Sequence, residues 1–278
     1  MESTERKVIG WDFFMVDQET LRKAQLKMVE ILEAIDDVCK KNDIEYFLCY
    51  GTLLGAVRHN GFIPWDDDCD IVMMKEHYKR FIQCANRDLP NNFFLQTNKT
   101  DNAYTKKVTK VRMKNTKFVE HDESDTELYC QGLFVDIFVW DYHYGFERLL
   151  TKLLRKISAL RYRRKVYPRG SFKRAFVSLL TAVPYLGYSF LQKLYRLFSP
   201  LWCNKKDLHW LGREAKLQDC VFVNKDVIYP LRNDIAFEGR YFPVPNDYDK
   251  FLTERYGDYM VSPPESERGL RHARYIEC

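Results

Sequence analysis

Residues 50–71 read YGTLLGAVRHNGFIPWDDDCDI, and the fold of the chain can be worked out from this stretch. The pair Gly51-Thr52 follows residues 44–50, an apolar run that is rich in strand-forming side chains. Four aspartates then lead into a second apolar run, so that residues 66–74 predict a second buried strand. We expect a short helix over 52–57 to join the two strands. Buried carboxylates are costly unless they are paired or bind a cation, so the second strand also indicates a functional site.

The four aspartates, Asp66, Asp67, Asp68 and Asp70, are candidates for binding a divalent cation. Because side chains alternate along a strand, Asp68 and Asp70 share one face, which Asp66 can join. Carboxylates at that separation repel one another, so that either some are protonated or a cation lies between them. Oxygen ligands of this kind suit Mg²⁺ or Mn²⁺. The alternative is a solvated acidic turn, which is disfavoured because apolar residues flank the run on both sides.

Asp136 is a further candidate, a lone carboxylate in the apolar run LFVDIFV at 133–139. This run is the strongest strand signal in the chain. A buried carboxylate needs a partner, and a salt bridge to a lysine or arginine would provide one. We favour metal ligation, because Asp68 and Asp70 supply two ligands of a site that still lacks a third.

The residues around Gly51 are candidates for holding phosphate groups. Backbone N–H groups at Gly51 and Thr52, where a helix is expected to begin, can donate hydrogen bonds to phosphate oxygens. Arg58 follows closely and can contact a substrate, with a structural cap as an equally good alternative.

Two basic residues of another predicted strand are candidates for the same task. Lys110 and Arg112 alternate on one face of a strand expected over 104–113, so both can meet phosphates. A solvated basic face is an equal alternative for this pair. For His272, near the end of the chain, we expect a structural role.

The whole pattern predicts an α/β (α+β) fold, a mixed sheet flanked by helices. An amphipathic helix with a regular apolar stripe covers residues 18–42. Further predicted elements are a helix over 75–88, strands over 93–96, 104–113 and 133–140, short strands and turns over 226–245, and a helix over 248–256. We divide the chain into a catalytic core at 1–145, a basic helical insert at 146–212 and a C-terminal part at 213–278 that packs on the core.

The segment 146–206 differs from the rest of the chain in charge. It contains 15 lysines and arginines and a single acidic residue, Glu147, although the net charge of the whole chain is only +5. Apolar stripes accompany these charges, a combination typical of helices that bind an anionic membrane surface. A basic subdomain packed on the acidic remainder is the alternative. We do not expect nucleic-acid binding, because the segment is rich in apolar residues.

Cysteine usage and the absence of leader and span signals predict a cytoplasmic protein. The eight cysteines are scattered without a C-x-x-C pair, which is typical of reduced, buried thiols. No apolar stretch follows the charged residues 1–7, and no run of 18 apolar residues is free of charge. With the basic segment, this favours a peripheral location at the inner face of the membrane.

Several motifs together resemble a known superfamily and one family within it. A Gly-Thr turn, an Asp-x-Asp strand and a later strand with one aspartate resemble the nucleotidyltransferase fold of the polymerase-beta-like superfamily. Residues 50–71 and the block GLFVDIF at 132–138 resemble the LicD family, bacterial phosphocholine transferases related to fukutin and fukutin-related protein. Residues 237–268 resemble a third block of that family, and the resemblance spans 21–272.

The resemblance implies a phosphotransferase that moves a substituted phosphate from a CDP-linked donor to a sugar hydroxyl. The acceptor would be a cell-surface glycan, such as lipopolysaccharide or teichoic acid, or its lipid-linked precursor. Magnesium or manganese held by Asp66, Asp68, Asp70 and Asp136 would neutralise the diphosphate. Catalysis would rest on Asp68, Asp70 and Asp136, with Asp136 accepting the proton of the acceptor hydroxyl.

The resemblance favours CDP-choline as the donor, and other functions remain open. Aromatic side chains near the motifs suit a quaternary ammonium group, although most of them are expected in the core. Ribitol- or glycerol-phosphate transfer within the same family is one alternative. A nucleotidyltransferase that releases pyrophosphate is another, and a catalytically silent membrane-surface protein is a third. The intact carboxylate set argues against the silent protein.

Overall fold

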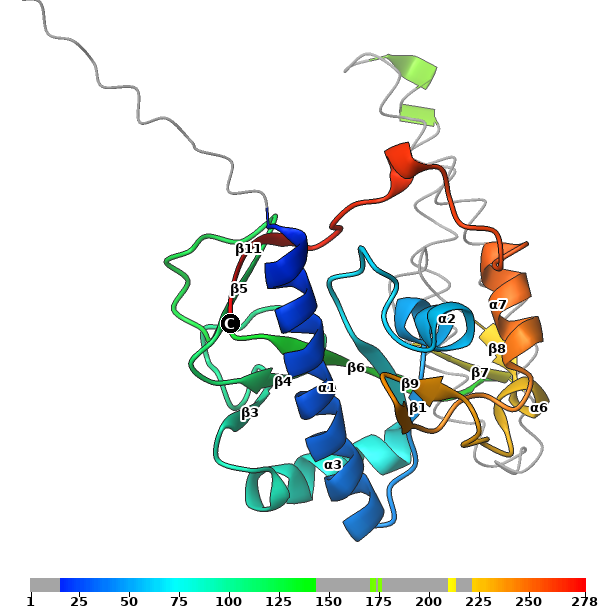
Figure 1. Ribbon diagram of the computed structural model, residues 1–278, viewed down its shortest axis with the longest axis horizontal. Helices are drawn as coiled ribbons and strands as arrows, with labels where there is room; N and C mark the ends of the chain where they lie inside the picture. The colour runs from blue at the N-terminus through cyan, green and yellow to red at the C-terminus, as the bar shows by residue number, and fades with distance from the viewer. Residues whose placement is uncertain (1–15, 144–170, 174, 177–209, 214–221) are drawn as a thin grey trace, which may run out of the picture.

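The computed structural model describes residues 16–143, 171–173, 175–176, 210–213 and 222–278 (Figure 1). The predicted basic insert at 146–212 therefore lies almost wholly outside the described residues, and so does its expected membrane-binding surface. In the part that is described, no helix has the length and apolar character needed to cross a membrane.

One mixed sheet organises the chain and confirms the predicted α/β class. Its central strands β2 (Asp70–Met74) and β6 (Phe134–His143) run parallel, whereas the other pairings are antiparallel. The strand order is β1-β2-β6-β4-β3, and β7 and β8 extend the sheet from the far end of β6. The remaining bounds are β1 Phe47–Leu48, β3 Phe93–Gln96, β4 Thr109–Met113, β7 Trp210–Arg213 and β8 Phe222–Asn224.

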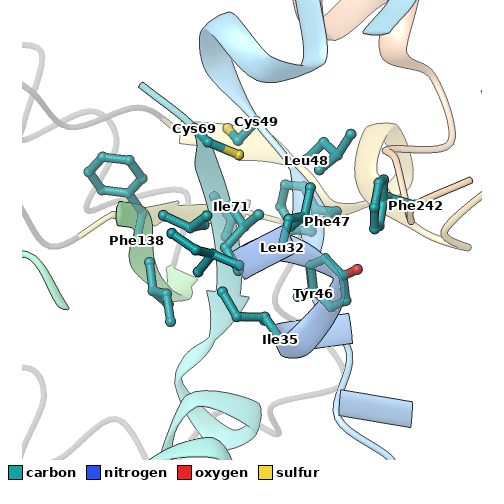
Figure 2. Close-up of a cluster of buried hydrophobic side chains, with 14 of the residues drawn as sticks. Leu32, Ile35, Tyr46, Phe47, Leu48, Cys49, Cys69, Ile71, Phe138 and Phe242 are labelled. Atoms are coloured by element: carbon teal, nitrogen blue, oxygen red, sulfur yellow. The ribbon is translucent and has the colours of Figure 1, made fainter. Parts of the chain in front are cut away.

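Helix α1 (Gln18–Lys41) lies across the sheet, as the apolar stripe predicted (Figure 1). The helix begins at Asp17, whose side chain accepts a hydrogen bond from the Thr20 amide, as an N-cap does. Its buried face packs on the strands: Figure 2 shows Leu32 and Ile35 beside Phe47 and Ile71. This apolar cluster forms the centre of the core.

Cysteines contribute to the same core. Cys49 and Cys69 lie near each other in it (Figure 2), and both are fully buried. With Cys39 and Cys84 they are free, buried thiols, as the scattered cysteines predicted, and they pack as small hydrophobic side chains.

The helices that follow connect and flank the strands. Helix α2 (Tyr50–His59) joins β1 to β2, and α3 (Lys75–Asp88) follows β2 directly. The C-terminal part adds α6 (Lys225–Ile228), the hairpin of β9 (Ala236–Phe237) and β10 (Arg240–Tyr241), α7 (Tyr248–Tyr256) and the 3₁₀ turn η4 (Glu265–Glu267).

A second, two-stranded sheet closes the chain, and the sequence analysis did not predict it. Strand β5 (Lys117–Glu120) pairs antiparallel with β11 (Ala273–Glu277), which carries the C-terminus. Both strands are short and mix charged with apolar residues, so neither has a strong strand pattern of its own. Their pairing brings residues near position 120 beside residues near position 273.

Several predicted boundaries need correction. The strand expected over 66–74 begins only at Asp70, because the chain turns at Ile63–Asp66 with a hydrogen bond between the Asp66 amide and the Ile63 carbonyl. Asp66, Asp67 and Asp68 therefore lie before the strand. The strand expected over 104–113 begins at Thr109.

Candidate active site

A cavity of about 910 Å³ lies where β2 and β6 begin, between α2 and α7. Five aspartates line it: the four predicted metal ligands Asp66, Asp68, Asp70 and Asp136, and also Asp258. The cavity has the size of a site for a nucleotide-sized molecule.

Strand register brings two of these aspartates together. Asp70 and Asp136 are partners in the parallel pairing of β2 with β6, and Lys110 is the antiparallel partner of Asp136 on β4. The three side chains therefore form one row across three neighbouring strands. The sequence predicted each aspartate on a strand, and the register shows that the two strands are adjacent.

The N-terminus of α2 shapes the cavity next to this row. Gly51 lines the cavity, and a β-carbon added to it would lie 2.5 Å from Oδ2 of Asp66, so a larger residue would displace that carboxylate. Thr52, predicted with Gly51 to contact phosphate, does not line the cavity. Its buried hydroxyl accepts a hydrogen bond from the Asp70 amide at 2.7 Å, which ties α2 to the start of β2.

Burial and mutual repulsion disfavour the charged form of these aspartates, and a bound cation would stabilise that form. Burial, followed by the charges of Asp68 and Asp136, raises the pKa of Asp70 well above its ordinary value. Burial together with the charges of Asp68 and Asp67 raises the pKa of Asp66 to about 8. Carboxylates crowded in this way repel one another until a positive charge is placed among them.

Lys110 supplies part of that positive charge. Its Nζ lies 2.7 Å from Oδ1 of Asp136 and 3.1 Å from Oε1 of Glu120, and it sits over the ring of Phe134. Burial raises the pKa of Asp136, and the ammonium of Lys110 opposes the shift. The salt bridge considered as the alternative for Asp136 is thus present, and Asp136 also lines the cavity.

Neither basic residue predicted on β4 lines the cavity. Lys110 is buried between Asp136 and Glu120. Arg112 is fully buried, where it donates to the side chain of Gln96 and to the Gly132 carbonyl. The structure gives Arg112 this structural position in place of the predicted donor contact, because β4 lies inside the sheet with β3 and β6 on either side.

A metal ion fits this end of the sheet. Oδ1 of Asp70 is buried and has no hydrogen-bond partner among the described residues, as expected of an oxygen that can bind a cation. Within the described residues, Asp67, Asp68 and His272 offer ligand atoms that lie within 4.8 Å of one another. The predicted set of Asp66, Asp68, Asp70 and Asp136 shares the cavity but is not gathered as closely.

His272 belongs to this site, contrary to the structural role expected from the sequence. Its Nε2 lies 3.1 Å from Oδ2 of Asp68, and the imidazole lines the cavity. The hydrogen bond with Asp68 raises the pKa of His272 to about 9. No local motif marks this histidine, because only the pairing of β11 with β5 brings it to the aspartates.

Three arginines line the cavity as well, and the sequence analysis named only one of them. Arg58 donates from Nη1 to the Tyr259 carbonyl at 2.8 Å, while Arg255 lies over the ring of Tyr50 at 4.3 Å. Arg271 precedes His272 in the chain. Aspartates at one end and arginines along the walls make a cavity suited to a phosphate-containing substrate.

Comparison with known proteins agrees with this chemistry. The sequence profile described as LicD/FKTN/FKRP, nucleotidyltransferase domain, matches residues 43–191. A lipopolysaccharide cholinephosphotransferase LicD of Haemophilus influenzae is 30% identical over 265 residues, which cover 91% of this chain and 96% of that protein. An uncharacterized protein of Rickettsia prowazekii is 38% identical over 72 residues, 24% of this chain and 27% of the relative.

Proposed function

Because the chain belongs to the LicD family, we propose that it transfers phosphocholine from CDP-choline to a hydroxyl of a cell-surface glycan or its lipid-linked precursor. The relative in Haemophilus influenzae, a lipopolysaccharide cholinephosphotransferase, supports phosphocholine and a glycan as substrates. The observation that carries the proposal is the row of Asp70 and Asp136 at the cavity, where a buried oxygen of Asp70 has no hydrogen-bond partner in the part of the chain that the structure describes.

We propose Asp66, Asp68, Asp70 and Asp136 as the residues that hold Mg²⁺ or Mn²⁺, through the carboxylates that face the cavity. Such an ion would neutralise the diphosphate of the donor and stabilise the departing CMP. Crowding of these four carboxylates supports the assignment, since a divalent cation relieves their repulsion.

The chain's own residues orient the donor and the acceptor. Gly51, at the first turn of α2, lets the diphosphate approach the backbone closely, and Arg58 supplies a positive charge from the same helix. Asp136 accepts the proton of the acceptor hydroxyl as that oxygen attacks the phosphorus and CMP leaves. Lys110 holds Asp136 at Oδ1 and so fixes the direction of its carboxylate. Most of the rate enhancement comes from this positioning.

Aromatic rings support choline as the group carried by the donor. Tyr50 and Phe138 line the cavity in an edge-to-face pair with ring centres 5.2 Å apart. The guanidinium of Arg255 already lies over the Tyr50 ring, so the ring face at this position accepts a cation. A quaternary ammonium group is recognised by the same kind of surface.

The deciding experiment offers the protein CDP-choline, CDP-ribitol and CDP-glycerol in turn, with Mg²⁺ or Mn²⁺ and a mixed glycan acceptor. We expect release of CMP with CDP-choline, together with incorporation of phosphocholine into the glycan. If only the ribitol or the glycerol donor is consumed, the assignment of choline is wrong, while the assignment of a phosphotransferase stands. Release of pyrophosphate from a nucleoside triphosphate, without CMP, would instead identify a nucleotidyltransferase.

We further propose that the basic segment at 146–206 holds the protein on an anionic membrane, near a lipid-linked acceptor. The excess of lysine and arginine in its sequence supports this, and all of the segment except residues 171–173 and 175–176 lies outside the described residues. Flotation with phosphatidylglycerol vesicles at low salt tests it. Recovery of the protein at the bottom of the gradient would contradict membrane binding.

A further inference from the structure

The carboxylate of Asp67 is directed away from the cavity and binds the C-terminal segment. It is fully buried and does not line the cavity, although its neighbours Asp66 and Asp68 do. Its Oδ2 accepts hydrogen bonds from the amides of His272 at 2.9 Å and Ala273 at 2.6 Å. Its Oδ1 faces the Arg271 amide at 3.3 Å. One carboxylate thus binds three consecutive backbone N–H groups.

The same segment is held from its other side by β5. The His272 carbonyl accepts a hydrogen bond from the His121 amide at 2.9 Å, and Ala273 pairs with Glu120 at the start of β11. The backbone of His272 therefore has its amide on Asp67 and its carbonyl on His121. With both ends fixed, the imidazole is directed toward the cavity.

That imidazole contacts Asp68, the residue next to Asp67 in the chain. Nε2 of His272 lies 3.1 Å from Oδ2 of Asp68. We propose that Asp67 is a positioning residue, which holds His272 against Asp68 so that the Asp68 carboxylate is oriented for the metal. The inference rests on the proposed function, because Asp68 is a metal ligand there.

The hydrogen bonds of Asp67 favour this positioning role over direct binding of the metal by Asp67. Both of its oxygens are occupied by backbone N–H groups, whereas the Asp68 carboxylate lines the cavity. In metal sites, partners that orient a ligand matter nearly as much as the ligand, and their loss weakens metal affinity or activity about 10–100-fold.

The test combines metal titration with hydrogen exchange on the full chain. Mn²⁺ affinity is measured by electron paramagnetic resonance for the wild type, Asp67→Ala, His272→Ala and the double variant. We expect each single variant to bind Mn²⁺ about 10–100-fold more weakly. The double variant should bind Mn²⁺ as tightly as the single variant with the lower affinity, because Asp67 acts through His272. Amide exchange in peptides covering 270–278 should be faster in Asp67→Ala.

A matched control separates positioning from general stability. Asp36, on helix α1, is also a buried carboxylate. It accepts a hydrogen bond from the Tyr46 hydroxyl and forms an ion pair with Lys40. Asp36→Ala should lower the melting temperature and leave Mn²⁺ affinity unchanged. If Asp67→Ala does not fold, Asp67→Asn takes its place, since one acceptor oxygen remains. His272→Ala removes a side chain that is 46% exposed and leaves the backbone contacts in place.

Each outcome bears on a different claim. Full-strength Mn²⁺ binding in His272→Ala, additive losses in the double variant, or unchanged exchange in Asp67→Ala would each overturn the inference. A wild type that binds neither Mn²⁺ nor Mg²⁺ would overturn it together with the metal assignment. Normal Mn²⁺ binding without CMP release from any CDP-alcohol would overturn the phosphotransferase alone.

Discussion

Asp70 and Asp136 face each other as register partners on the parallel strands β2 and β6, at the edge of the sheet where the cavity opens. Two carboxylates on adjacent strands destabilise the fold unless a positive charge offsets their repulsion. Lys110 offsets part of it from β4. The repulsion that Lys110 does not offset is the physical reason to expect a divalent cation at this site.

Asp70→Asn, and likewise Asp68→Asn and Asp136→Asn, should abolish transfer while the fold is kept. Each loses a ligand charge worth several kcal/mol of transition-state stabilisation, so turnover should fall about 100-fold or more. For Asp70→Asn the melting temperature should hold or rise, because a buried charge is removed. The checks are CMP release at saturating Mn²⁺ and thermal melting, with the exposed Asp37→Asn as control. Near-normal turnover in any of the three would exclude that position from the site.

Gly51→Ala should impair activity and spare stability. The new β-carbon would lie 2.5 Å from Oδ2 of Asp66 and push that carboxylate aside, whereas alanine favours the helical backbone by up to about 1 kcal/mol. We expect at least a tenfold loss of turnover, since each factor of ten costs about 1.4 kcal/mol.

Gly55→Ala provides the contrast for Gly51→Ala. Its β-carbon would lie 2.4 Å from the Gly61 carbonyl oxygen, a backbone atom that cannot move aside cheaply. The melting temperature of Gly55→Ala should therefore be lower than that of the wild type. Equal stability loss in both variants would show that Gly51 serves packing and not the cavity.

Lys110→Met should destabilise the protein strongly. The substitution leaves the Asp136 carboxylate without its ammonium partner, a loss of about 3–5 kcal/mol for a broken buried pair, whereas Glu120 keeps its ion pair with Lys106. Urea unfolding measures it. Adding Asp136→Asn to Lys110→Met should restore part of the stability, because the carboxylate that lost its partner is then replaced by a neutral amide. A double variant less stable than Lys110→Met would contradict this account of the network.

Acid should weaken the protein partly through Glu120. Burial alone would raise the pKa of Glu120, but Lys110 and Lys106 lower it to about 2, from 4.5 in the unfolded chain. A depressed carboxylate pKa stabilises the fold above the unfolded value, and this contribution is lost as pH falls from about 4.5 toward 2. The full effect is on the order of 3 kcal/mol.

Urea unfolding at pH 7 and pH 3 tests the contribution of Glu120. The wild type should lose more stability between these two pH values than Glu120→Gln does. The control is Glu30→Gln, on the exposed side of α1, which should follow the wild type. An identical loss in the wild type and Glu120→Gln would remove Glu120 from the acid response.

Local pattern was enough to predict the class of fold and to single out aspartates that line the cavity. The apolar stripe of α1, the helix over 248–256 and the core strand with Asp136 are confirmed, because each is a long or strongly periodic segment. The aspartates near position 68 stood out because charge in an apolar setting is costly wherever the chain folds.

Only the tertiary structure decided which residues complete the site. Arg112 is buried and His272 reaches the cavity, both against expectation. Asp67 and Asp68 are neighbours with the same side chain, yet one binds backbone amides of the C-terminal segment and the other faces the cavity. Alternation along an extended segment predicts that the two point to opposite sides, and Asp66, Asp68 and Asp70 do line one cavity as expected. What local pattern could not show is the partner of Asp67, because the amides that it binds lie more than 200 positions away in the chain.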